Sequence, residues 1–132
     1  MTRGTIRNRA YAQQIRDFSG LRFGSITPTD IDGFFEIAGR VFVFIEAKHG
    51  ASQMPRGQRL AMERLVDAIH SPPNRYAAAF IASHNTDGDI DFGSAPVTMV
   101  RYEGRWHHRP GNVSLKASID AFLLFAGADV GA

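Results

Sequence analysis

Residues 41–48, VFVFIEAK, decide what the surrounding chain can form. The five consecutive apolar residues are β-branched or aromatic, which predicts a strand with both faces buried, as in the centre of an α/β sheet. Glu46 and Lys48 follow at the end of this strand. They are two positions apart and therefore project from the same face. Because a buried carboxylate or ammonium is costly unless it is paired or used, this end of the strand is a candidate functional site.

The flanking segments predict helices and further strands. Apolar residues at helical spacing predict helices at residues 5–18, 57–70 and 114–126, with Ser114 as the N-cap of the last one and Gly127 at its end. Strands are predicted at residues 30–37, 76–83 and 96–102, with loops at residues 19–29, 49–57 and 85–95. The order helix, strand, strand, helix, strand, strand, helix predicts a mixed α/β sheet flanked by helices.

Length and composition fit one compact domain over residues 1–132. The apolar fraction of 44% is enough for a buried core, and no stretch approaches the roughly 20 apolar residues of a membrane helix. We therefore expect no membrane partner, and the first residues show no secretory signal. The absence of cysteine excludes disulfides, thiolate zinc sites and a cysteine nucleophile, and it is compatible with a reducing cytosol.

The positive charge is unevenly distributed, although the net charge is only +2. Clustered arginines attract polyanions, so DNA is a candidate partner, with a solvated surface as the alternative. The two clusters lie in residues 1–23 and 101–109 and consist of Arg3, Arg7, Arg9, Arg16 and Arg22, and of Arg101, Arg105 and Arg109 with His107 and His108.

A third group of arginines belongs to the predicted helix 57–70 and the loop before it. Arg56, Arg59 and Arg64 are placed to contact a phosphodiester backbone. Glu63 and Asp67 are i,i+4-type partners for Arg59 and Arg64, so some of these arginines are expected to form ordinary helix ion pairs.

The alignment of the first two strands decides whether acidic side chains meet beside Lys48. If Ile37 pairs with Val41, Asp32 lies opposite Glu46, with Cβ atoms about 5 Å apart, and the two carboxylates could share a divalent cation. If Ile37 pairs with Arg40 instead, the two carboxylates fall on opposite faces. The site therefore requires a particular turn around residues 38–39.

The same alignment would place Asp30 opposite Lys48. Hard cations such as Mg²⁺ prefer carboxylate oxygens and waters, usually with one or two protein carboxylates. Such an ion polarises phosphoryl groups, and a neighbouring lysine can position water or stabilise charge on the phosphate.

Two phrases of the sequence carry a resemblance to a known family. Residues 27–33, TPTDIDG, precede the predicted hairpin, and residues 44–48, FIEAK, end it. Together they resemble the signature of the PD-(D/E)XK nuclease superfamily, whose members have the restriction-endonuclease-like fold. The resemblance covers about residues 5–83. It implies a mixed sheet flanked by helices and an endonuclease that uses Mg²⁺ or Mn²⁺ to hydrolyse DNA phosphodiester bonds.

The resemblance also implies residue roles. Glu46 and Lys48 match the Glu-x-Lys half of the signature. Either Asp32 or Asp30 would bind the metal with Glu46, and the carbonyl of Ala47 would add a ligand. Asp30 fits the phrase proline-x-aspartate, whereas Asp32 lies closer to the hairpin and is slightly preferred.

The resemblance also extends to two residues that the family carries on its helices. Many relatives carry a glutamine that faces the metal on the helix after the hairpin, and Gln58 matches it, so that Lys48 and Gln58 would arrange the water and the scissile phosphate. Several relatives carry an acidic residue on the first helix. The predicted helix 5–18 offers only Asp17, near its end.

Other functions and features stay open. One alternative is a catalytically silent nuclease-fold module for binding or assembly, of a phage-encoded kind, with Glu46 and Lys48 as an ion pair. Another is a nucleic-acid binder without chemistry. A homodimer is plausible, and the resemblance implies the cytoplasm of a prokaryotic or phage-infected cell. Residues 87–91, DGDID, lack the downstream glycine and glutamate of a calcium loop and are expected to be a solvated loop.

Overall fold

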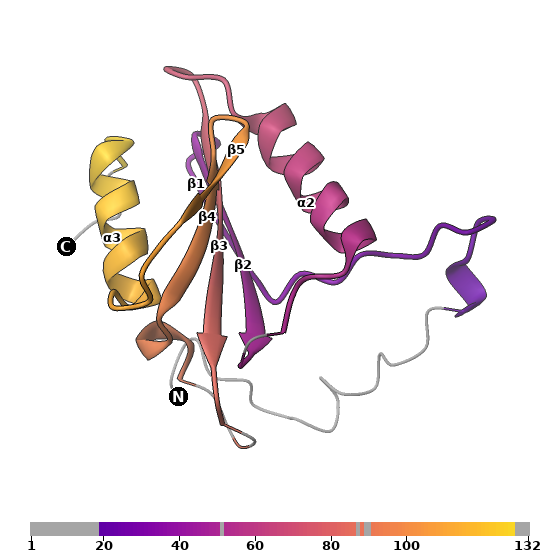
Figure 1. Cartoon of the computed structure of the whole chain (residues 1–132). Coiled ribbons are helices and arrows are strands. Elements are labelled where there is room, and N and C mark those ends of the chain that lie inside the picture. Colours follow the sequence, from indigo (N-terminus) through magenta and orange to yellow (C-terminus); the bar gives the residue numbers. More distant parts are fainter. Residues whose placement is uncertain (1–18, 51, 87, 89–90, 129–132) are drawn as a thin grey trace, which may run out of the picture.

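The computed structural model describes residues 19–50, 52–86, 88 and 91–128. They form a mixed α/β sheet in the spatial order β1-β2-β3-β4-β5, with one helix on each face (Figure 1). The strands are β1 (Gly33–Ile37), β2 (Val41–His49), β3 (Tyr76–His84), β4 (Val97–Tyr102) and β5 (Arg105–His108). The helices are α2 (Arg56–Ile69) and α3 (Leu115–Phe125), and two short 3-10 turns are η1 (Ser19–Leu21) and η2 (Phe92–Ser94).

Strands β2 and β3 run parallel and form the middle of the architecture, whereas β1, β4 and β5 join antiparallel. The chain passes from β2 to β3 through α2, which covers one face of the sheet (Figure 1). Helix α3 covers the opposite face. The expected mixed sheet flanked by helices is confirmed at this level.

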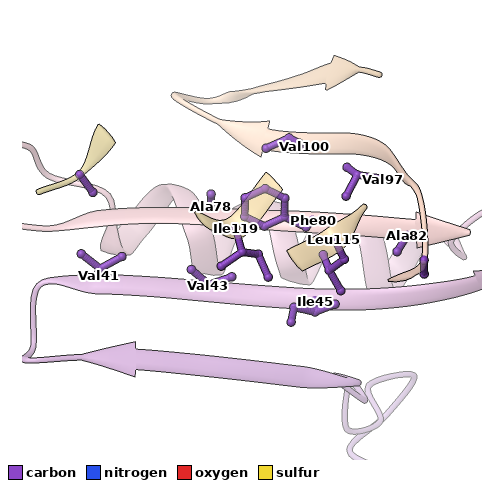
Figure 2. Close-up of a cluster of buried hydrophobic side chains, with 12 residues drawn as sticks. Val41, Val43, Ile45, Ala78, Phe80, Ala82, Val97, Val100, Leu115 and Ile119 are labelled. Carbon is purple, nitrogen blue, oxygen red and sulfur yellow. The ribbon is translucent and has the colours of Figure 1, made fainter. Parts of the chain in front are cut away.

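Small side chains on β3 let both helices approach the sheet. Ala77 and Ala79 are fully buried on the α2 face, and Ala78 and Ala82 are fully buried on the α3 face. On the α3 side, residues of β2, β3 and β4 pack against Leu115 and Ile119 of α3 (Figure 2). Burial of both faces of β2 and β3 follows the continuous apolar runs in their sequences.

Several predicted boundaries differ from the observed ones. The first strand begins at Gly33 rather than at residue 30, because Asp32 lies in a bend. The sequence pattern also missed β5, whose four residues include two histidines and one arginine. Ser114 caps α3 as expected, since its hydroxyl accepts a hydrogen bond from the Ala117 backbone N–H at 3.1 Å. The predicted helix 5–18 lies outside the described residues.

The register of the β1–β2 hairpin is the one on which the site depends. Ile37 pairs with Val41, and the ladder continues to Gly33 opposite Ile45. The connection turns on Ala38 and Gly39, whose φ angles are 54° and 68°. This left-handed backbone is natural for glycine but costs a residue with a Cβ about 1–2 kcal/mol.

None of the helices described here is long and apolar enough to cross a membrane.

The geometry of this turn predicts that glycine-to-alanine substitutions at Gly39 and at Gly57 change the stability of the fold in opposite directions. A Cβ at Gly39 or at Gly57 would meet no heavy atom within 4 Å, so only the backbone distinguishes the two positions. We expect Gly39→Ala to lower the free energy of unfolding by about 1 kcal/mol because of its positive φ. Gly57→Ala, in the first turn of α2, should raise it by about 0.5–1 kcal/mol. Urea unfolding followed by circular dichroism measures both, and a change of the same sign in the two variants would contradict the turn geometry.

Candidate active site

Glu46 and Lys48 project from the end of β2 on the face covered by α2. Glu46 is 4% exposed, and its Oε1 lies 3.2 Å from Nζ of Lys48. The Lys48 side chain is 15% exposed. The ammonium therefore pairs with the carboxylate while it retains contact with the surface.

Gln58, in the first turn of α2, connects this pair to the segment before β1. Its Oε1 accepts a hydrogen bond from Lys48 Nζ at 3.3 Å, and its Nε2 donates to the backbone carbonyl of Asp30 at 3.2 Å. Both ends of the amide are therefore engaged, which orients Gln58 and restrains the ammonium of Lys48. The structure thus brings together three of the residues selected from the sequence.

The two aspartates have different positions. Strand pairing stops at Gly33, so Asp30 forms no cross-strand pair with Lys48 and contributes its carbonyl to Gln58 instead. Asp32 is exposed, and its Oδ2 accepts a hydrogen bond from the Ala47 backbone N–H at 2.8 Å. This bond holds the Asp32 carboxylate at the end of β2, at the residue that follows Glu46.

Burial raises the pKa of Glu46 above its ordinary value, and the Asp32 carboxylate raises it further. The nearby Gln58 amide and the ammonium of Lys48 act in the opposite direction. The Oε2 atom of Glu46 is buried without a hydrogen-bond partner among the described residues. A carboxylate with one paired and one unpaired buried oxygen is able to accept a cation or a donated hydrogen.

Two hollows open beside the pair. We call the first the carboxylate hollow; it has a volume of about 750 Å³, and its lining includes Asp30, Glu46, Gln58 and Arg64. We call the second the tryptophan hollow; it has a volume of about 500 Å³ and is lined by residues that include Lys48, Met54, Arg59, Trp106 and His108. Glu46 lines the first and Lys48 lines the second, so the ion pair lies at their junction.

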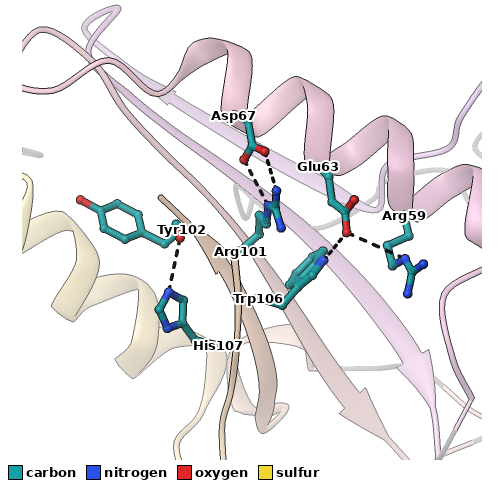
Figure 3. A network of polar contacts seen from close by, with 7 residues as sticks. All are labelled: Arg59, Glu63, Asp67, Arg101, Tyr102, Trp106 and His107. Carbon is teal, nitrogen blue, oxygen red and sulfur yellow. Dashed lines mark hydrogen bonds and ion pairs between the residues drawn. The ribbon is translucent and has the colours of Figure 1, made fainter. Parts of the chain in front are cut away.

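Some of the arginines predicted to contact a polyanion form ion pairs within the protein instead. Arg101 forms a two-pronged ion pair with Asp67 of α2 and lies over the ring of Trp106, with its guanidinium carbon 5.8 Å from the ring centroid (Figure 3). The expected pairing of Asp67 with Arg64 is therefore wrong, because a side chain from β4 reaches Asp67 instead. Sequence reasoning missed this contact, since it joins residues 34 positions apart.

The expected pairing of Arg59 with Glu63 is confirmed, with Arg59 Nε 3.8 Å from Glu63 Oε2. The same oxygen accepts a hydrogen bond from the indole Nε1 of Trp106 at 2.5 Å (Figure 3). Glu63 thus orients both a cation and an aromatic ring at the wall of the tryptophan hollow.

Four of the five histidines belong to strands and lie in three places. His49 and His84 end neighbouring strands on the α3 side of the sheet, away from Glu46, with ring centroids 5.1 Å apart. His107 is partly buried, and its Nε2 lies 3.3 Å from the Tyr102 carbonyl oxygen (Figure 3). His108 is exposed and lines the tryptophan hollow.

Within the described parts of the chain, no three or more histidine, cysteine, aspartate or glutamate side chains are grouped to hold a metal ion. Asp32 is the acidic side chain whose charge acts on Glu46, and its carboxylate accepts the backbone N–H of Ala47, the residue after Glu46. Two carboxylates with water are a donor set that suits Mg²⁺ or Mn²⁺. The other acidic candidate, Asp17, lies outside the described residues, as do Arg3, Arg7, Arg9 and Arg16 and most of the loop 87–91.

Comparisons of the chain with models of protein families, with curated proteins and with solved structures find no match.

The burial of Glu46 predicts that its partner lysine stabilises the fold. Lys48→Met leaves a buried carboxylate without its neighbouring charge, and we expect the free energy of unfolding to fall by about 1–3 kcal/mol at neutral pH. Lys116→Met is the matched control, because Lys116 and Asp120 pair on the surface of α3 with side chains 73% and 56% exposed. That variant should change stability by less than about 0.5 kcal/mol. Equal effects in urea unfolding would contradict the buried pair.

Proposed function

We propose that this chain is a divalent-metal-dependent nuclease that hydrolyses DNA phosphodiester bonds at the end of β2. The observation that carries the proposal is the environment of Glu46, which is buried, is paired through one oxygen with Lys48 and has no partner among the described residues at the other oxygen. An uncompensated buried oxygen destabilises a fold, so its retention beside an open hollow favours a functional role.

A restriction-endonuclease-like fold is part of the proposal. Its support is the order of the elements, in which the β1–β2 hairpin leads through α2 to the parallel strand β3, and the two phrases TPTDIDG and FIEAK, which border this hairpin.

The donor chemistry fits Mg²⁺ or Mn²⁺. Glu46 and Asp32 would hold the ion, with the Ala47 carbonyl as a further donor. The charge of the ion would offset the burial of Glu46 and the repulsion from Asp32, which both raise the pKa of Glu46. When bound, the ion would supply a Lewis acid for the scissile phosphate.

The other residues of the site position charge. Lys48 would direct its ammonium at the phosphate and stabilise negative charge that develops there. Gln58 would keep Lys48 in place, since it accepts from Nζ and is itself held by the carbonyl of Asp30. Arg64 lines the carboxylate hollow, and no described residue pairs with its guanidinium, so it would bind a backbone phosphate.

Glu46→Gln and Lys48→Ala separate metal binding from hydrolysis. We expect the unchanged protein to bind Mn²⁺ in isothermal titration calorimetry and to nick plasmid DNA when Mg²⁺ or Mn²⁺ is added. Glu46→Gln should lose the metal signal because it removes a charged ligand. Lys48→Ala should keep metal binding but lose cleavage by at least about 100-fold, the scale expected when a charge-stabilising group is removed.

Lys116→Ala serves as the control for a lost surface lysine and should cleave normally. Retained cleavage in Lys48→Ala would refute the proposed role of the amine. If the unchanged protein neither binds metal nor cuts DNA, the nuclease proposal fails, and the silent binding or assembly module takes its place.

A further inference from the structure

The tryptophan hollow has a composition that differs from that of the carboxylate hollow. Its walls combine the apolar side chains of Met54, Met99 and Trp106 with two cationic side chains, Lys48 and Arg59. Of the described residues that line it, none is acidic, whereas Asp30 and Glu46 line the carboxylate hollow. An anionic group attached to a flat ring that can stack on an aromatic side chain fits such a lining better than a bare anion does.

Contacts from α2 hold this wall in place without a ligand. Glu63 accepts the indole N–H of Trp106 and pairs with Arg59, so the ring and the guanidinium share one anchor (Figure 3). Arg101, itself held by Asp67, lies over the same ring. Binding to a wall that is already ordered loses less side-chain entropy, which favours a recognition surface.

The hollow also adjoins the proposed site of hydrolysis. Lys48 lines it, and the ammonium of Lys48 lies 3.2 Å from Glu46, which lines the carboxylate hollow. A nucleic-acid strand with a phosphate beside this pair would therefore place the adjoining nucleotide at the tryptophan hollow.

We propose that the tryptophan hollow binds one unpaired nucleotide of the DNA strand, with the base against Trp106 and the phosphate near Arg59 and Lys48. This proposal rests on the proposed nuclease function. It predicts that the substrate of the nuclease is DNA with an unpaired base, such as a single strand or a flap. A base in a duplex is held in its stack and has to leave it to enter a hollow, which costs free energy that an unpaired base does not lose.

Trp106 is the only tryptophan in the chain, so its fluorescence reports on this hollow. The probes are a short single-stranded thymidylate oligonucleotide and the same strand in a blunt duplex with adenylate, both in EDTA so that no cleavage occurs. We expect saturable quenching by the single strand, with an affinity at least about five-fold higher than for the duplex, as one stacked base contributes. Unchanged emission with the single strand, or equal quenching by the duplex, would overturn the proposal.

A charge-matched pair of variants tests the phosphate contact. Arg59→Gln should weaken binding of the fluorescein-labelled single strand in an anisotropy titration by about three-fold or more, because it removes one phosphate contact. Arg40→Gln removes the same charge from an exposed arginine at the β1–β2 turn and should leave the affinity nearly unchanged. An equal loss in both variants would show general charge attraction and overturn the assignment.

Glu46→Gln distinguishes this proposal from that of the nuclease. The variant should still show quenching, since Glu46 lies in the other hollow. Metal-dependent cleavage by the unchanged protein without quenching by the single strand would refute the nucleotide site and leave the nuclease standing. Quenching without any cleavage would refute the nuclease and leave a single-strand binding surface.

Discussion

The buried carboxylate of Glu46 is the constraint around which this structure is arranged. A carboxylate that is 4% exposed loses most of its hydration, and burial accordingly raises its pKa. Two side chains offset this loss of hydration of the Glu46 carboxylate: Lys48 on the same strand and Gln58 on α2. The compensation is incomplete, because Oε2 has no partner in the part of the chain that the structure describes.

The rest of the fold explains how such a group is kept in place. Alanines on β3 allow α2 and α3 to pack closely on the two faces of the sheet, which buries β2 along most of its length. The Ile37–Val41 register then directs the chain before β1 toward the same end of β2. As a result Asp32 reaches the Ala47 backbone, and Asp30 reaches Gln58.

A second group of polar side chains lies on the same face of the sheet, but its charges are paired. Glu63 and Asp67 on α2 hold Trp106 and Arg101 of the β4–β5 hairpin (Figure 3). These contacts fasten the far side of the sheet to α2 with satisfied charges, in contrast to the unsatisfied oxygen of Glu46. The face therefore combines a paired region with an incompletely paired one, and the two hollows meet at the Glu46–Lys48 pair of the latter.

The sequence by itself determined the central strands, the helices α2 and α3, and the candidate residues Glu46, Lys48 and Gln58. These follow from local patterns: a continuous apolar run, helical spacing, and charged residues at the end of a buried strand. Only the tertiary structure decided the hairpin register, the different roles of Asp30 and Asp32, and the partner of Asp67. Register depends on two left-handed turn residues, and the pairing of Asp67 with Arg101 joins separate elements, so neither is encoded in a short window of sequence.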